Sequence, residues 1–136
     1  MAKRKTWMPA KPAKAKVKLS PAKMAEIQNL CQPIVKLFKE KFVKSNPDKS
    51  CNYLVDVYTK WYRNYLYFCE KYQSEHPNRI SDEYESKFVR LEYTTDDQFN
   101  FSYFRHTGQW FLIANDVTLN DCLEMMRDNP SFQPIG

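Results

Sequence analysis

The first 23 residues contain eight basic side chains and no acidic one. The chain as a whole has 21 basic and 16 acidic residues, which leaves 13 basic against 16 acidic side chains beyond residue 23. Lysines repel one another, and this segment offers little apolar surface to offset the entropy of ordering. We therefore expect residues 1–19 to be a disordered basic tail and residues 20–136 to form one domain.

The tail is expected to bind an anionic partner, because the net positive charge of the chain is confined to this end of it. RNA or a ribonucleoprotein is the favoured partner, and an acidic protein is the alternative. Trp7 either stacks on a base or folds back on the body of the protein. The residues assigned to nucleic-acid contact in the tail are Lys3, Arg4, Lys5, Trp7, Lys11, Lys14, Lys16 and Lys18.

Residues 20–45 have the pattern of an amphipathic helix. Large apolar residues recur at steps of three and four from Met24 to Phe42, which places them on one face. Ser20 is suited to cap this helix and Pro21 to be its first residue. Pro33 lies inside it and lacks an N–H group, so we expect a kink or a break near residues 31–32.

The middle of the chain is rich in β-formers and partly alternates in polarity, which predicts antiparallel strands. Residues 61–64 are predicted to connect the first two strands and residues 74–85 to form a loop, while Gly108 is expected to provide a positive φ in the last hairpin. A helix over residues 54–72 remains the rival interpretation. The predicted strands are 51–60, 65–73, 87–94, 99–105 and 110–115.

A second helix is predicted from Leu119 to Asp128, with Thr118 as its N-cap and Asn129-Pro130 at its end. The resulting fold class is α+β: a kinked N-terminal helix, a five-stranded antiparallel sheet and a C-terminal helix, with the helices on one face of the sheet.

The four cysteines contain no C-x-x-C pair, and the chain has only two histidines. We therefore expect no metal site, no cofactor and no disulfide framework, and four reduced, mostly buried thiols. The N-terminus is too polar for a secretory signal, and no apolar run is long enough to span a membrane. These observations predict a cytoplasmic protein.

The most suggestive stretch for binding is residues 58–65, where cations alternate with aromatic rings. Aromatic rings stack on bases while cations meet phosphates, so this texture suits single-stranded nucleic acid. The other interpretation is a hairpin whose rings pack into the core. The candidate contact residues here are Lys60, Trp61, Tyr62 and Arg63.

A second candidate cluster lies around the last hairpin and consists of Tyr103, Arg105, His106 and Trp110. Arg105 and His106 are its candidate contacts, because cations at a strand end can bind a phosphate or a carboxylate. A structural role in the turn competes with this interpretation for His106. No catalytic residue is assigned, since no nucleophile or acid is placed beside His106 by the sequence. The loop acids Asp82, Glu83 and Glu85 are interpreted as solubilising residues.

From residue 51 onward the chain resembles a family of small, uncharacterised bacterial proteins described only as a domain of unknown function. The resemblance is carried by residues 55–72, 86–93, 102–110 and 119–132, above all by the string RHTGQW and the helix that ends in DNPSF. It implies the order of strands and helix given above and a bacterial cytoplasmic setting. It implies no activity and no site residues.

The hypothesis that follows is a non-enzymatic binding protein whose lysine-rich tail contacts nucleic acid. The alternative is a protein-interaction or assembly module that uses an exposed aromatic face of the sheet. Such a face could also join copies of the chain into a homo-oligomer. A small enzyme using Arg105 and His106 and a peripheral membrane binder are weaker alternatives.

Overall fold

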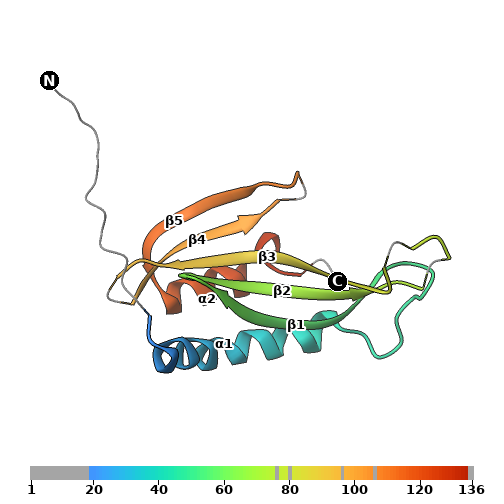
Figure 1. Ribbon diagram of the computed structural model, residues 1–136, viewed down its shortest axis with the longest axis horizontal. Coiled ribbons are helices and arrows are strands. Elements are labelled where there is room, and N and C mark those ends of the chain that lie inside the picture. Colours follow the sequence, from blue (N-terminus) through green and yellow to red (C-terminus); the bar gives the residue numbers. More distant parts are fainter. Residues whose placement is uncertain (1–18, 76, 80, 96, 106, 135–136) are drawn as a thin grey trace, which may run out of the picture.

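The computed structural model describes residues 19–75, 77–79, 81–95, 97–105 and 107–134. It confirms the α+β fold class, with an N-terminal helix, five antiparallel strands and a C-terminal helix (Figure 1). The predictions for residues 1–18 and for His106 fall outside the described residues. The elements are α1 (Pro21–Phe42), β1 (Tyr53–Tyr62), β2 (Tyr65–Gln73), β3 (Glu83–Tyr93), β4 (Gln98–Phe104), β5 (Trp110–Thr118), α2 (Leu119–Asp128) and the 3-10 turn η1 (Pro130–Phe132).

The five strands form a meander in which every strand pairs with its neighbour in the sequence. The β3–β4 pairing covers only Val89–Tyr93, although β3 already begins at Glu83. The β4–β5 hairpin therefore diverges from the first half of β3, as Figure 1 shows. Because the strands pair in sequence order, β1 and β5 are the two edges of the sheet.

Several sequence-based boundaries differ from the structure: β1 starts at Tyr53, α1 ends at Phe42 and β5 continues to Thr118. Cross-strand pairing explains two further differences. Trp61 belongs to β1, whose last residue, Tyr62, pairs with Tyr65, so only Arg63 and Asn64 make the turn. Arg63 has a φ of 55°, the left-handed conformation that a tight hairpin requires. The predicted loop 74–85 is also too long, because β3 starts at Glu83 opposite the end of β2.

Helix α1 begins as the sequence indicates. The Ser20 hydroxyl accepts a hydrogen bond from the Lys23 N–H, and Pro21 is the first helical residue. The helix runs through Pro33 to Phe42 without the break that was one of the two expectations. Burial of Ile34 and Phe38 against the core supports the turns after the proline, and packing of this kind provides most helical stability in proteins.

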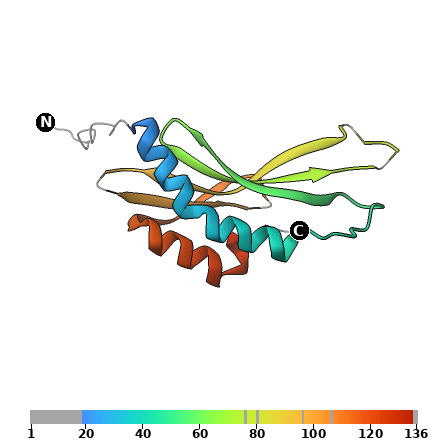
Figure 2. The same ribbon diagram turned by 90° about the horizontal axis from the view of Figure 1, so that it is seen from below.

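Both helices pack on the same face of the sheet, and Figure 2, seen from below, shows α1 and α2 side by side on this face. The core lies between this face and the helices. The other face carries no helix and is called the open face here. The fully buried large side chains of the core include Ile34, Val35, Phe38, Val57, Leu66, Phe68, Val89, Leu91, Phe99, Phe101 and Met126.

Candidate functional site

Aromatic or charged side chains from all five strands lie on the open face, since Phe104 of β4 pairs with Trp110 of β5 and the two ring centroids are 5.1 Å apart. Alternation along each strand sends every second residue to this face. A register shift between Phe68 and Cys69 leaves Phe88 as an extra residue of β3. Because of this bulge, Lys87 and Arg90 both reach the open face although they are three residues apart. The residues of the open face that matter below are Tyr58, Lys60, Tyr65, Tyr67, Cys69, Glu85, Lys87, Arg90 and Trp110.

Aromatic rings and cations alternate in space across this face. The Arg90 guanidinium lies between two rings, 5.0 Å from the centroid of Tyr65 and 4.7 Å from that of Trp110. The Tyr67 ring lies 6.0 Å from Tyr65 and 5.8 Å from Trp110, and the Lys87 ammonium lies 5.6 Å from its centroid. All five side chains are half-buried, so parts of their surfaces remain in contact with solvent. We call them the aromatic cluster.

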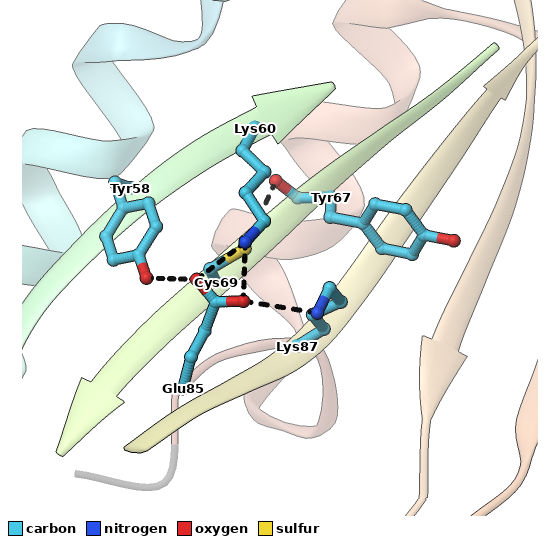
Figure 3. A network of polar contacts seen from close by, with 6 residues as sticks. All are labelled: Tyr58, Lys60, Tyr67, Cys69, Glu85 and Lys87. Carbon is cyan, nitrogen blue, oxygen red and sulfur yellow. Dashed lines mark hydrogen bonds and ion pairs between the residues drawn. The ribbon is translucent and has the colours of Figure 1, made fainter. Parts of the chain in front are cut away.

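Next to the aromatic cluster, the Glu85 carboxylate accepts hydrogen bonds from three side chains (Figure 3). The Tyr58 hydroxyl and the Lys60 ammonium, at 2.8 Å, both donate to its carboxylate. The Lys87 ammonium donates as well, at 3.2 Å. Burial by itself would raise the pKa of Glu85, but the three hydrogen bonds outweigh it and lower the pKa to about 2. Glu85 is therefore ionised at neutral pH and fixes two lysines on the open face.

Cys69 is buried beneath this network, with its thiol below the Lys60–Glu85 pair in Figure 3. Burial raises the pKa of its thiol to about 11, so it is not a nucleophile at neutral pH. Burial also raises the pKa of the Tyr58 hydroxyl above its usual value, and the hydrogen bond to Glu85 adds to this. At neutral pH Glu85 is therefore ionised and the Tyr58 hydroxyl is protonated. Neither group changes its protonation state easily near pH 7, so the site suits binding better than acid–base catalysis.

Within the described ranges, no group of three His, Cys, Asp or Glu side chains is arranged to hold a metal ion. In the same part of the chain, no helix is both long and apolar enough to cross a membrane. All four cysteines are free, and Cys31, Cys69 and Cys122 are buried while Cys51 is exposed.

Residues 23–134 match a protein family described as a domain of unknown function (DUF3024). This chain belongs to that family. The match includes α1 and so extends further toward the N-terminus than the resemblance seen from residue 51 onward. Neither the curated proteins nor the solved structures contain a match to the chain. Membership in the family brings no activity, so the site must be interpreted from its own chemistry.

The structure divides the predicted contact residues of the first hairpin between the two faces. Lys60 lies on the open face, paired with Glu85. Trp61 instead faces the helices, packs against the core and donates its indole N–H to the Met24 carbonyl at 3.1 Å. Tyr62 and Arg63 are exposed at the hairpin end, with the Arg63 guanidinium 5.3 Å from the Tyr62 ring. The core interpretation therefore holds for Trp61, whose ring is not part of the open face.

Arg105 lies apart from the aromatic cluster. Its guanidinium is 4.8 Å from the Phe111 ring, which follows Trp110 in β5 and so points to the opposite side of the strand. Arg105 also lines a pocket of about 450 Å³ where β4 leaves β3, together with the buried Glu70. His106, its predicted companion, is outside the described residues.

The residue that sequence reasoning missed is Glu85, which was placed in a solubilising loop. The signal that could have found it is alternation: Glu85 and Lys87 are two residues apart and share a face once β3 is extended to Glu83. Tyr65, Tyr67 and Trp110 could have been grouped by the same rule, but the sequence does not tell which face the helices cover.

Proposed function

We propose that this protein binds single-stranded nucleic acid, RNA in particular, with the basic tail and the open face as two separate contacts. The observation that supports this most is the aromatic cluster, in which Tyr65, Tyr67 and Trp110 surround Arg90 on a sheet face without helices. Aromatic rings on an uncovered sheet face are a general means of stacking unpaired bases.

The chemistry favours a single strand over a duplex. A ring can stack only on a base whose π-face is accessible, and in a duplex neighbouring base pairs cover these faces. Lys60 and Lys87 beside the rings would meet the phosphates that link the stacked bases. Glu85 cancels part of their charge, so the open face contributes stacking more than electrostatic attraction.

Most of the electrostatic attraction is assigned to the tail. Lys23, the last of the eight basic residues, is a residue of α1 whose ammonium lies 2.7 Å from an Asp97 carboxylate oxygen. It is therefore neutralised within the fold, and seven basic residues remain in 1–18. A segment of this length could extend on the order of 50 Å, enough to pass from the start of α1 around the sheet.

We infer that the protein acts by binding, without catalytic residues or a cofactor, in a bacterial cytoplasm. The free and mostly buried cysteines support a reducing compartment. An acidic protein is the competing partner for the tail, but the rings of Tyr65, Tyr67 and Trp110 favour bases over carboxylates as ligands of the open face.

Fluorescence anisotropy with a labelled unstructured RNA oligonucleotide, measured over a series of salt concentrations, tests both contacts. We expect a log–log salt slope of about −4 if six tail cations each neutralise a phosphate. Deleting residues 1–18 should flatten this slope. The double variant Tyr67→Ala/Trp110→Ala should weaken binding by about 1–3 kcal/mol per lost stack and leave the slope nearly unchanged.

Tyr84→Ala is the matched control, because Tyr84 is an exposed aromatic residue of β3 that stacks on Tyr72, away from the aromatic cluster. It should bind RNA like the wild type. Equal affinity of the wild type and the tail deletion would remove the tail from the proposal, and an unaffected Tyr67→Ala/Trp110→Ala variant would remove the open face. Competition by polyglutamate as strong as by RNA would identify an acidic protein as the partner.

A further inference from the structure

A hollow with apolar walls lies on the helix side of the sheet, between the edge strand β5 and α2. Its volume is about 670 Å³, and Ile113, Met125 and Phe132 line it with apolar side chains. Ile113 is 44% exposed, a high value for a branched apolar residue. Hollows of this volume commonly hold a ligand or a side chain of a partner. We call it the α2 hollow.

The helix side of the α2 hollow is acidic. Asp121, Glu124 and Asp128 also line it, and their spacing along α2 places all three on one face of the helix. Within the described residues, none of the three carboxylates forms an ion pair. Glu124 and Asp128 lie in the second half of α2, where the helix dipole favours cations. A cation bound in the hollow would therefore be stabilised by the carboxylates and by the helix end.

The chemistry of the hollow selects its occupant. Phosphates would be repelled by the three carboxylates, so nucleic acid does not fit there. Two copies of the chain that met through this hollow would bring two acidic groups together, which is also unfavourable. The occupant that fits is a basic segment with a large apolar side chain.

We propose that residues 1–18 of the same chain dock in the α2 hollow when the protein is free of nucleic acid. These residues contain seven basic side chains and no acidic one, and Trp7 and Met8 are adjacent large apolar residues among them. In the docked state, Trp7 and Met8 cover the apolar wall of the hollow, and the lysines lie beside its carboxylates.

The tail joins the fold close to the start of α2. The Lys23 ammonium, in the first turn of α1, lies 2.7 Å from an Asp97 carboxylate oxygen. The next residue, Gln98, pairs with Thr118, which is the N-cap of α2. Both helices therefore begin at the same end of the sheet, as Figure 2 shows.

The tail is also long enough to reach the whole hollow. From Met8 to Leu19 the chain spans about 34 Å when extended at about 3.1 Å per residue, whereas α2 is only about 15 Å long. A tether of this length keeps the tail at an effective concentration on the order of millimolar near the hollow. A contact with a dissociation constant of about that size is thus populated about half of the time.

Docking of the tail concerns the free protein and does not depend on what the tail binds when a ligand is present. The experiments that test it therefore contain no nucleic acid. A tail that does not dock leaves RNA binding untouched, and a protein that does not bind RNA leaves docking untouched, so the two proposals fail separately.

Acrylamide quenching of Trp7 fluorescence in the full chain tests whether the tail docks. The Trp7 signal is the difference between each protein and its Trp7→Phe counterpart, because Trp61 and Trp110 also emit. At about 20 mM salt, quenching should be about half as efficient in the wild type as in Glu124→Gln/Asp128→Asn, since a contact populated about half of the time shields the ring for that time. At about 500 mM salt the two proteins should agree, because salt screens the ion pairs.

Glu40→Gln/Glu83→Gln is the matched control. It also removes two exposed carboxylates, one on α1 and one on β3, and neither lines the α2 hollow. Its Trp7 should be quenched like that of the wild type. Equal quenching in the wild type and in Glu124→Gln/Asp128→Asn at low salt would overturn the inference, and so would wild-type quenching that does not change with salt.

A cross-link tests where the tail docks. In a Cys51→Ser background, which removes the exposed native thiol, Met8→Cys/Ile113→Cys should form an intramolecular disulfide on mild oxidation. Met8→Cys/Leu30→Cys is the control. Leu30 is 54% exposed and lies nine residues, about 14 Å, from the start of α1, so the tail reaches it without docking.

The disulfide should form about tenfold faster in Met8→Cys/Ile113→Cys than in the control, because docking holds the two thiols near one another. Equal rates would overturn the inference even if Trp7 were protected from acrylamide, since the tail would then lie elsewhere. Disulfides that form only between separate chains would overturn it as well.

Discussion

The Arg90 guanidinium carbon lies 4.7 Å from the centroid of the Trp110 ring, although β4 separates their two strands in the sheet. Ser102, the β4 residue that pairs with Arg90, makes this contact possible. Its side chain is small and 5% exposed, so the long arginine reaches over it to the next strand. The contact ties the β4–β5 hairpin to β3 on the open face.

Removing this contact should destabilise the protein measurably. A cation held over aromatic rings at a half-buried site contributes about 0.5–1 kcal/mol per ring, so Arg90→Met should cost about 1–2 kcal/mol. A double-mutant cycle with Trp110→Leu, measured by urea denaturation, should give a coupling energy of about 0.5–1 kcal/mol. Additive effects of the two substitutions would show that the two side chains do not stabilise one another.

Glu85→Gln should lower the free energy of unfolding at pH 7 by about 2 kcal/mol, because it leaves Lys60, Lys87 and the Tyr58 hydroxyl without their common charged acceptor. Glu83→Gln is the matched control on the same strand. Its ion pair with Lys71, at 3.4 Å, is exposed, so its loss should cost less than about 0.5 kcal/mol. Equal losses in the two variants would contradict a special role for Glu85.

The contribution of Glu85 should also depend on pH in a defined window. Its pKa is about 2 in the folded protein and near 4.5 in the unfolded chain. A carboxyl whose folded pKa is depressed stabilises the fold fully above the unfolded pKa and loses this contribution as the pH falls toward the folded pKa. The difference in stability between the wild type and Glu85→Gln should therefore narrow from pH 5 to about pH 2. A constant difference over this range would contradict the depressed pKa.

One of the four thiols should react far faster than the others with a thiol reagent under native conditions. Cys51 is exposed, whereas burial raises the pKa of Cys31 and Cys122 to about 12 and that of Cys69 to about 11. Buried thiols react only when the structure opens. A dithiobisnitrobenzoate assay should show one fast equivalent and three slow ones, and Cys51→Ser should abolish the fast phase. A second fast thiol would contradict the packing described above.

Gly108→Ala should destabilise the β4–β5 hairpin by about 1 kcal/mol. The cause is conformational and not steric, because the φ of Gly108 is 87° while an added Cβ would meet no atom within 4 Å. Asn tolerates this left-handed region better than Ala, so Gly108→Asn should cost less. Thermal denaturation of the three proteins checks the order, and a larger loss for Asn than for Ala would contradict this explanation.

Local patterns in the sequence were sufficient to predict the bounds of several helices and strands. Thr118 caps α2 by accepting a hydrogen bond from the Asp121 N–H, and α2 has the bounds that were predicted. The second strand also begins and ends as expected, at Tyr65 and Gln73. These features depend on residues within a few positions of one another, so neighbouring side chains determine them.

The composition of the site was determined by tertiary structure. Glu85 of β3 meets Lys60 of β1 across the intervening strand β2, and Trp61 points toward Met24 of α1. Neither contact can be deduced from alternation alone, because alternation separates two faces without indicating which one the helices will cover. The sequence by itself determined the segregated charge, the order of the strands and the N-caps of both helices. Only the packing of α1 and α2 on one face decided which rings and cations remain on the open face.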